Sequence, residues 1–219
     1  MSTEKIIVVK SIAPKFRTTL LAAAKSMTGM SGPNAMSSTV TKVQSLVSDA
    51  LSKGAVLEFG ENTLASGTQH LKQMLVGKVD AGMDIYHQET FGPVSTLIEV
   101  EDVEEAIKVA NDTEYGLSAS VFSRDLSLAI QVAKRIESGA VHINGNTIHD
   151  ENCLPHGGTN LPLPFCLYLR RFLCHISPLL RVVLIVGYKK SGFGRFGSKY
   201  GFDEFLQTKT ITIKFNEVL

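Results

Sequence analysis

A carboxylate and an aromatic ring stand close together in the segment from Gln88 to Val94, which reads Gln-Glu-Thr-Phe-Gly-Pro-Val. The residues that follow, 94–100, form an alternating apolar run that predicts a strand. A turn that presents Glu89 and Phe91 just before a buried strand is a good place to hold a ligand, because a rigid element then fixes the binding residues. We therefore take Glu89 and Phe91 as the candidate binding residues.

A second cluster of potential metal ligands has a simpler interpretation. Imidazole, carboxylate and thiolate groups all bind metals, and here they gather around three histidines that recur at intervals of seven. Their spacing matches no zinc pattern, so we interpret them as solvated loop residues and expect no metal site. The residues are His142, His149, His156, Asp150, Glu151 and Cys153.

The glycines Gly192, Gly194 and Gly197 have the Gly-x-Gly-x-x-Gly spacing of dinucleotide-binding turns. That pattern needs a complete strand–helix–strand unit and an acidic residue about 20 positions later. Too few residues follow Gly197, and they indicate a strand, so we predict a tight turn here instead of a cofactor site. The pair Cys174-His175 is adjacent in sequence, which does not by itself create a thiolate–imidazole pair. We assign no catalytic residue.

The charge balance excludes several classes of partner. The 219 residues carry 22 basic and 21 acidic side chains, for a net charge of +1, so we expect neither nucleic acid nor an acidic membrane surface. Three cysteines make no secreted disulfide framework, and the N-terminus does not resemble a signal peptide. The sequence holds no uninterrupted apolar run of about 20 residues, so we expect no transmembrane helix and a cytoplasmic location.

The first part of the chain predicts two strands and two helices. Residues 6–9 and 55–59 indicate strands, and Gly54 ends a helix expected over 38–53. An earlier helix, capped by Ser11, should carry one apolar face. Residues 60–78 are weakly patterned and predict no element. The expected face of the first helix consists of Phe16, Leu20, Ala23 and Met27.

From residue 94 onward, strands and helices alternate with short connections. Strands are expected over 94–100, 117–122 and 140–144. Asp102 should cap a helix that runs to Asn111, with Glu105 as its capping-box partner, and Asp125 should cap one that runs to Glu137. This alternation predicts an α/β fold in which helices flank a parallel sheet and the crossovers are right-handed.

Several sequence blocks resemble those of a known protein family and occur in the same order as in that family. They are residues 1–8, 89–94, 110–117, 119–122, 154–158, 188–195 and 209–213. Together they resemble the NAD(P)-dependent aldehyde dehydrogenases, and residues 143–145 and 149–151 are similar to the salicylaldehyde and vanillin dehydrogenase branch. The resemblance implies a catalytic-domain fold with a C-terminal oligomerisation strand, an aldehyde substrate, and NAD or NADP as cofactor. It also implies that Glu89 binds the nicotinamide ribose and that Phe91 lies beside the nicotinamide ring.

The family chemistry requires groups that this sequence does not match. Family members use thiolate attack on the aldehyde, hydride transfer to NAD(P) and hydrolysis of the thioester. The nucleophile would fall directly before Met1, and the general-base Glu, the oxyanion Asn and most of the cofactor domain would lie further upstream. We therefore expect a truncated chain, inactive alone, whose nucleotide pocket lacks its other wall. Two alternatives stay open: a nonenzymatic partner that joins a full-length relative through the strand from Ile211 to Phe215, and a nucleotide-binding pseudoenzyme.

Residues 159–187 differ from the rest of the chain in composition. They contain no acidic residue but two of the 3 cysteines and three of the 7 prolines. Deleting them joins Gly158 to Tyr188 and restores the family block Gly-Gly-Tyr-Lys-Lys-Ser-Gly, which suggests a translated intron; the alternative is a natural loop. The expected organisation is a catalytic domain over 1–158 and 188–205, interrupted by this insert and followed by an oligomerisation tail over 206–219.

The intron hypothesis predicts a spliced message without the insert. Sequencing of transcripts across the Gly158 codon should find a form in which Gly158 is followed directly by Tyr188 in the same reading frame. If every spliced message retained residues 159–187, the insert would be a natural loop.

Overall fold

The computed structural model describes residues 3–26, 37–63, 71–148, 189–191 and 197. Two compact units divide the chain: one comprises Met1–Glu114, Ser118–Glu137 and Val141–Ile148, and the other comprises Tyr115–Leu117, Ser138–Ala140 and His149–Leu219. Several predicted features lie outside the described residues. These are the insert at 159–187, the strand from Ile211 to Phe215, the Cys174-His175 pair, Gly192, Gly194, and the cluster members from His149 to His156.

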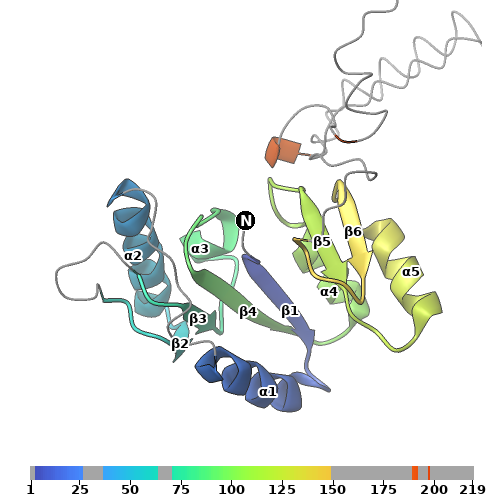
Figure 1. Cartoon of the computed structure of the whole chain (residues 1–219), viewed down its shortest axis with the longest axis horizontal. Coiled ribbons are helices and arrows are strands. Elements are labelled where there is room, and N and C mark those ends of the chain that lie inside the picture. The colour runs from blue at the N-terminus through green and yellow to red at the C-terminus, as the bar shows by residue number, and fades with distance from the viewer. Residues whose placement is uncertain (1–2, 27–36, 64–70, 149–188, 192–196, 198–219) are drawn as a thin grey trace, which may run out of the picture. The chain divides into compact units, whose positions relative to one another are not determined.

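A four-stranded sheet forms the centre of the first unit (Figure 1). Its order is β1-β4-β3-β2, with bounds Lys5–Val9 for β1, Val94–Val100 for β4, Met74–Gly77 for β3 and Val56–Phe59 for β2. β4 pairs in parallel with β1 and β3, whereas β2 and β3 are antiparallel. The sequence did not predict β3, because all four of its residues are buried and such a strand shows no apolar–polar alternation.

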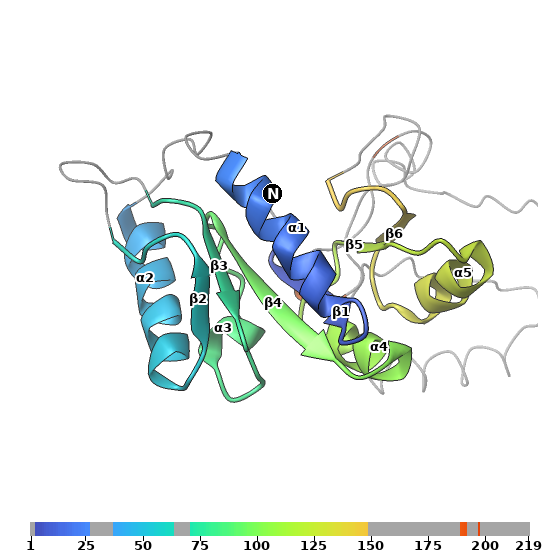
Figure 2. The same cartoon turned by 90° about the horizontal axis from the view of Figure 1, so that it is seen from below.

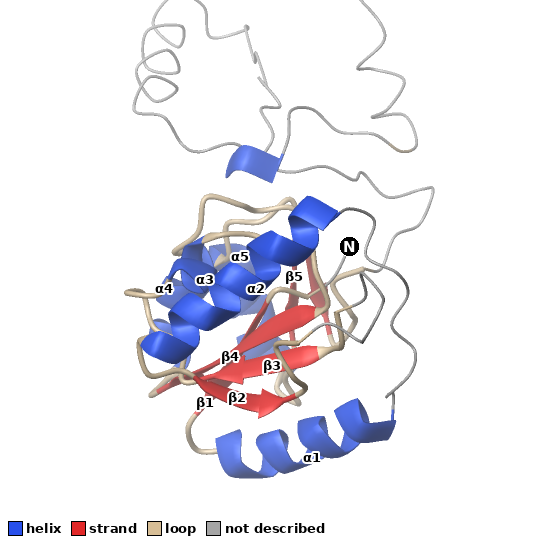
Figure 3. Ribbon diagram, turned by 90° about the vertical axis from the view of Figure 1, so that its left-hand side faces the viewer, coloured by secondary structure: helices blue, strands red, loops and turns tan. Residues whose placement is uncertain are grey.

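Helices cover both faces of this sheet (Figures 2 and 3). α1 (Ala13–Ser26) lies on one face, and α2 (Ser37–Ser52) and α3 (Asp84–His87) lie on the other. Because side chains alternate along a strand, Leu97 of β4 packs toward α1 while its neighbour Ile98 packs toward α2 and α3. The α/β fold class predicted from the sequence is therefore confirmed.

The buried face of α1 differs from the predicted one. Ala13 is buried and Leu20 and Leu21 pack on the sheet, whereas Phe16 is 36% exposed. Ala23, from the predicted face, is also exposed, and Met27 lies outside the described residues. A charged side chain of α1 reaches two strands of the sheet. Arg17 pairs with Glu58 of β2 and Glu99 of β4.

The last two strands form a separate two-stranded sheet. β5 (Ser118–Val121) pairs with β6 (Ala140–Ile143), and the backbone bonds Gly139 N–H to Gly116 O and Asn144 N–H to Val121 O advance in the same direction, as in a parallel pair. The alternation of elements suggested one continuous sheet. β5 does not join β4 because β1 and β3 already occupy both edges of β4.

Two predicted helix caps, Asp102 and Asp125, are confirmed with small differences. The predicted cap Ser11 is wrong, because α1 begins at Ala13 and Ile12 directly precedes it. Asp102 caps α4 (Val103–Asn111) by accepting from the Glu105 N–H at 2.8 Å, and the Glu105 carboxylate accepts from the Glu101 N–H at 2.6 Å, one residue before the cap. Asp125 caps α5 (Leu126–Arg135) by accepting from the Leu128 N–H at 3.1 Å.

A single amide side chain joins the ends of α4 and α5. The Asn111 Nδ2 donates to the Arg135 carbonyl at 2.9 Å, and its Oδ1 accepts from the Glu137 N–H at 2.9 Å. These bonds satisfy backbone groups that a helix end leaves unpaired, so α5 stops at Arg135 and not at Glu137 as predicted. Arg135 also forms a bidentate pair with Glu104 at 2.6 and 2.5 Å.

In the second unit the structure describes a short 3-10 helix, η1 (Lys189–Ser191), Gly197, and the residues that lead into β5 and β6, which are Tyr115–Leu117 and Ser138–Ala140. There the Gly116 N–H donates to Ser191 Oγ at 2.8 Å. None of the helices within the described ranges combines the length and apolar character that a bilayer crossing needs.

Replacing Asn111 by alanine should destabilise the first unit. The Asn111→Ala variant removes the hydrogen bonds to the Arg135 carbonyl and the Glu137 N–H, which should cost about 0.5–1.5 kcal/mol. Urea denaturation followed by circular dichroism measures this loss of unfolding free energy. Asn146 is exposed, so Asn146→Ala is the matched control and should change little. Equal effects of the two substitutions would contradict the role of Asn111.

Candidate functional site

Strand register brings the predicted binding turn next to the start of the chain. Lys5 of β1 pairs with Thr96 of β4, so the residues before these two parallel strands meet at the same edge of the sheet. Glu4 precedes β1, and its carbonyl accepts from the Thr96 N–H at 2.8 Å and from Thr96 Oγ1 at 3.1 Å. The backbone of Glu4 is therefore fixed beside the turn that leads into β4.

The Glu4 carboxylate binds the turn directly. Its Oε2 accepts from the Thr90 N–H at 3.2 Å and from the Thr90 hydroxyl at 2.8 Å, and its Oε1 accepts from the Phe91 N–H at 3.1 Å. Thr90, which is 2% exposed, uses the same hydroxyl to accept from the Gly92 N–H at 3.2 Å. All three consecutive backbone donors of the turn thus have a partner.

Phe91 adopts an unusual conformation within this turn. Its φ is +50°, in the left-handed region that a bulky residue seldom occupies, yet its side chain is 74% exposed. Such a conformation costs on the order of 1–3 kcal/mol, and a hydrogen bond to a charged group contributes about 1.5–3 kcal/mol. The hydrogen bonds that Glu4 accepts from Thr90 and Phe91 are therefore strong enough to offset the cost of this conformation, in which the Phe91 ring lies in solvent.

α2 supports the turn from the other side. The Lys42 ammonium donates to the Glu89 carbonyl at 2.6 Å. Gly92 lies so close to α2 that a Cβ at this position would stand 2.6 Å from Val43 Cγ2, which is far inside van der Waals contact. Only glycine fits here unless the buried Val43 side chain shifts, so the Gly of the sequence motif has a packing role.

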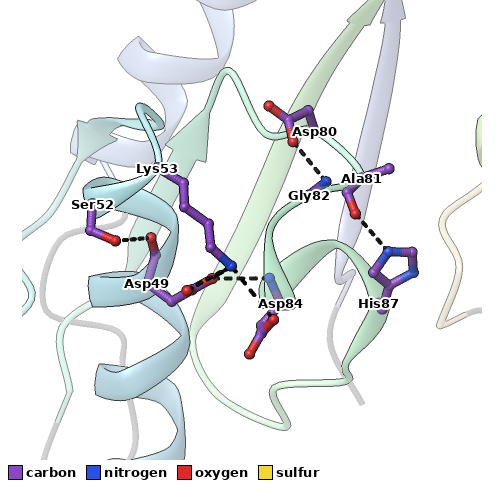
Figure 4. Close-up of polar contacts among 8 residues, drawn as sticks. All are labelled: Asp49, Ser52, Lys53, Asp80, Ala81, Gly82, Asp84 and His87. Atoms are coloured by element: carbon purple, nitrogen blue, oxygen red, sulfur yellow. Dashed lines mark hydrogen bonds and ion pairs between the residues drawn. The ribbon is translucent and has the colours of Figure 1, made fainter.

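α3, which leads into the turn, is anchored at two points. At its start, Asp49 of α2 accepts from the Asp84 N–H at 3.0 Å and pairs with Lys53 at 2.8 Å (Figure 4). At its buried end, the Tyr86 hydroxyl donates to Asp112 Oδ2 at 3.0 Å, and burial followed by this bond raises the pKa of Tyr86 to about 12. These contacts fix the point from which the turn begins.

The Glu89 carboxyl has an altered acidity. Its half-buried position raises the pKa of Glu89 above the ordinary value, and the negative charge of Glu4 raises it further. The positive charge of Lys42 lowers it in part. A partly desolvated carboxylate beside an exposed aromatic ring is able to accept hydrogen bonds from hydroxyl groups of a ligand while the ring covers an apolar or aromatic surface.

The structure places both predicted binding residues, Glu89 and Phe91, on one turn. It also shows two residues that hold this turn, Glu4 and Lys42, which sequence reasoning missed. Glu4 lies far away in sequence and Lys42 is on a different helix, so neither shared a motif with the turn. Only the pairing register of β1 and β4 would have revealed Glu4. The interpretation of His142 as a solvated loop residue is wrong, because it lies half-buried in β6. The described part of the chain holds no cluster of three or more metal-binding side chains.

Known proteins resemble the chain in sequence and in structure. A model of the aldehyde dehydrogenase family matches residues 1–161. A vanillin dehydrogenase of Pseudomonas fluorescens is 34% identical over 98% of this chain and 39% of its own length. The crystal structure of a salicylaldehyde dehydrogenase from Pseudomonas putida G7, complexed with salicylaldehyde, is 29% identical with a TM-score of 0.79 and aligns with 99% of this chain and 40% of its own. Succinic semialdehyde dehydrogenase from Streptococcus pyogenes, in complex with NADP+ as the cofactor, is 27% identical with a TM-score of 0.75 over 96% and 41%. The chain spans about two fifths of the length of these relatives.

The raised pKa of Glu89 predicts a pH-dependent effect of its replacement. A carboxyl whose pKa is raised by folding favours the folded state at low pH, and this contribution is lost as pH rises through the folded-state pKa. Glu89→Gln should therefore gain unfolding free energy relative to wild type between about pH 4 and pH 7. Denaturant titrations at several pH values measure the difference.

The matched control is Glu104→Gln, whose stability relative to wild type should change with pH in the opposite direction. Hydrogen bonding to Arg135 lowers the pKa of Glu104, so its stabilising contribution is complete above about pH 5 and is lost at lower pH; Glu104→Gln should therefore lose stability relative to wild type as pH rises to about 5, and no further above it. If both variants followed the same trend, the assigned environment of Glu89 would be wrong.

Proposed function

The chain belongs to the aldehyde dehydrogenase family, and we propose that its turn at Glu89–Gly92 forms the nicotinamide–ribose side of an NAD(P) site. The observation that carries this proposal is the exposed Phe91 ring, held in a left-handed backbone conformation beside a partly desolvated carboxyl. Side chains kept in costly conformations are concentrated at ligand-binding and active sites. The match of the surrounding sequence to this family supports the same assignment.

The residues of the turn fit the chemistry of a nicotinamide nucleotide. The ionised Glu89 carboxylate has only acceptor capacity, which suits the two hydroxyl groups of a ribose. The Phe91 ring offers a flat apolar surface to an aromatic ring. When bound, NAD(P)+ supplies the acceptor for the hydride that leaves the substrate carbon. The two side chains then orient the ribose and limit the access of water to the nicotinamide.

The reaction to which this site contributes is oxidation of an aromatic aldehyde. One aldehyde, one water and one NAD(P)+ give one carboxylic acid, one NAD(P)H and one proton. Similarity to a vanillin dehydrogenase, and to a salicylaldehyde dehydrogenase whose structure contains salicylaldehyde, supports an aromatic substrate. The small number of cysteines supports a reducing compartment such as the cytoplasm.

The 219 residues alone are proposed to bind nucleotide without turning over substrate. They match about two fifths of the length of relatives that carry out the whole reaction. We therefore expect no NADH production when the purified 219-residue protein is mixed with NAD+ and benzaldehyde, measured by absorbance at the NADH band. Measurable turnover by pure protein would overturn this part of the proposal.

Nucleotide binding is tested through the fluorescence of NADH and NADPH, because the chain has no tryptophan of its own. Wild-type protein should give weak but saturable binding, and Phe91→Ala and Glu89→Gln should each weaken it about tenfold, which corresponds to about 1.4 kcal/mol. Phe122 is the matched control, since it is 71% exposed compared with 74% for Phe91.

The Phe122→Ala variant should bind NADH as wild type does, because Phe122 follows β5 and takes no part in the turn. If it weakened binding as much as Phe91→Ala, the effect would reflect general exposure of aromatic surface. Absence of saturable binding by the wild-type protein would contradict the proposed site.

A further inference from the structure

We infer that Glu4 is a positioning residue of this site: its carboxylate holds Phe91 in the conformation that presents the ring. The inference rests on the proposed nucleotide site, but its geometric part stands on the contacts alone. Glu4 accepts hydrogen bonds from the N–H groups of Thr90 and Phe91 and from the Thr90 hydroxyl. Nothing in the sequence motif that contains Glu89 and Phe91 points to a residue so far away in the chain.

The backbone and the side chain of Glu4 bind different parts of the structure. Its backbone carbonyl accepts two bonds from Thr96, which belongs to the central strand β4 and is 2% exposed. Its carboxylate reaches the turn that precedes the same strand. Because the backbone of Glu4 is hydrogen-bonded to β4, its carboxylate ties the turn to the sheet.

Thr90 extends this attachment through the turn. Its buried hydroxyl donates to Glu4 and accepts from the Gly92 N–H, so the carboxylate binds two successive backbone donors directly and orders the third through Thr90. Successive donors that point at one carboxylate curl the chain around it, as in anion-binding backbone concavities. The left-handed φ of Phe91 follows from this curl, and the ring is directed into solvent because the backbone is directed toward Glu4.

A purely structural role for Glu4 makes a different prediction from a positioning role. Loss of a structural contact lowers global stability but leaves the folded turn unchanged. Loss of a positioning contact changes the turn within a folded protein. The backbone conformation of Phe91 and the hydrogen exchange of the Thr90 and Phe91 amides therefore separate the two roles.

The experiment uses the isotopically labelled 219-residue protein and its Glu4→Gln variant, whose side chain keeps its length but loses its charge and one acceptor atom. We expect the Thr90 and Phe91 amides to exchange at least about tenfold faster in the variant. The carbon chemical shifts of Phe91 should leave the left-handed range, and NADH affinity should fall about tenfold. Asn111→Ala is the control, because it destabilises the same unit without touching the turn.

The inference is overturned if Glu4→Gln leaves the exchange rates and the Phe91 shifts as they are in Asn111→Ala. If wild-type protein does not bind NADH, the proposed nucleotide site fails, and the exchange rates and shifts still decide whether Glu4 positions Phe91. If the conformation changes in Glu4→Gln but NADH affinity does not, Glu4 shapes the turn without a role in binding, which also overturns the inference.

A second variant protects the test against misfolding of Glu4→Gln. Glycine adopts a left-handed φ without steric cost, so Phe91→Gly removes the strain that Glu4 offsets. Phe91→Gly should therefore stabilise the wild-type protein more than it stabilises Glu4→Gln, in which Phe91 has already left the left-handed range, as measured by urea denaturation. Equal stabilisation in the two backgrounds would mean that the Phe91 conformation does not depend on Glu4, and would contradict the inference.

Discussion

The parallel pairing of β1 with β4 is the constraint on which the candidate site depends. Its register sets Lys5 opposite Thr96, which places the residue before β1 within hydrogen-bond reach of the turn before β4. The central position of β4, between β1 and β3, makes this register unambiguous, because a shift by one residue would exchange its two buried faces. The geometry of an exposed turn is thus determined by packing inside the sheet.

Local signals in the sequence were sufficient for the caps of α4 and α5 and for most strands. Asp102 and Asp125 cap helices as predicted, because an N-cap depends on neighbours within a few residues. Pairing between distant strands left no such signal, so the separate β5–β6 sheet was not foreseen. The strand β3 was missed because it is fully buried and shows no apolar–polar alternation. The orientation of α1 was also predicted wrongly: Phe16 is 36% exposed, whereas Arg17 reaches Glu58 and Glu99 on two strands.

The candidate site likewise combines residues that a local motif identifies with residues that only the fold brings together. Glu89 and Phe91 were found because they occupy one short motif, and the structure places them on one turn. The groups that shape this turn, Glu4 and Lys42, come from separate elements and act on its backbone from opposite sides with opposite charges. A carboxylate on the amide donors and an ammonium on a carbonyl satisfy the polar groups of the turn without a partner from the ligand. The side chains of Glu89 and Phe91 are left to make contacts of their own.

Gly92 gives this arrangement a mechanical consequence. Because its backbone touches Val43 with no side chain between them, α2 and the turn share one contact surface. A displacement of α2 toward the sheet edge would push on the peptide next to Phe91, and a ligand pressing on the ring would push back on the helix. Substitutions that reshape the core beneath α2 would thus alter the orientation of an aromatic side chain that none of them touches.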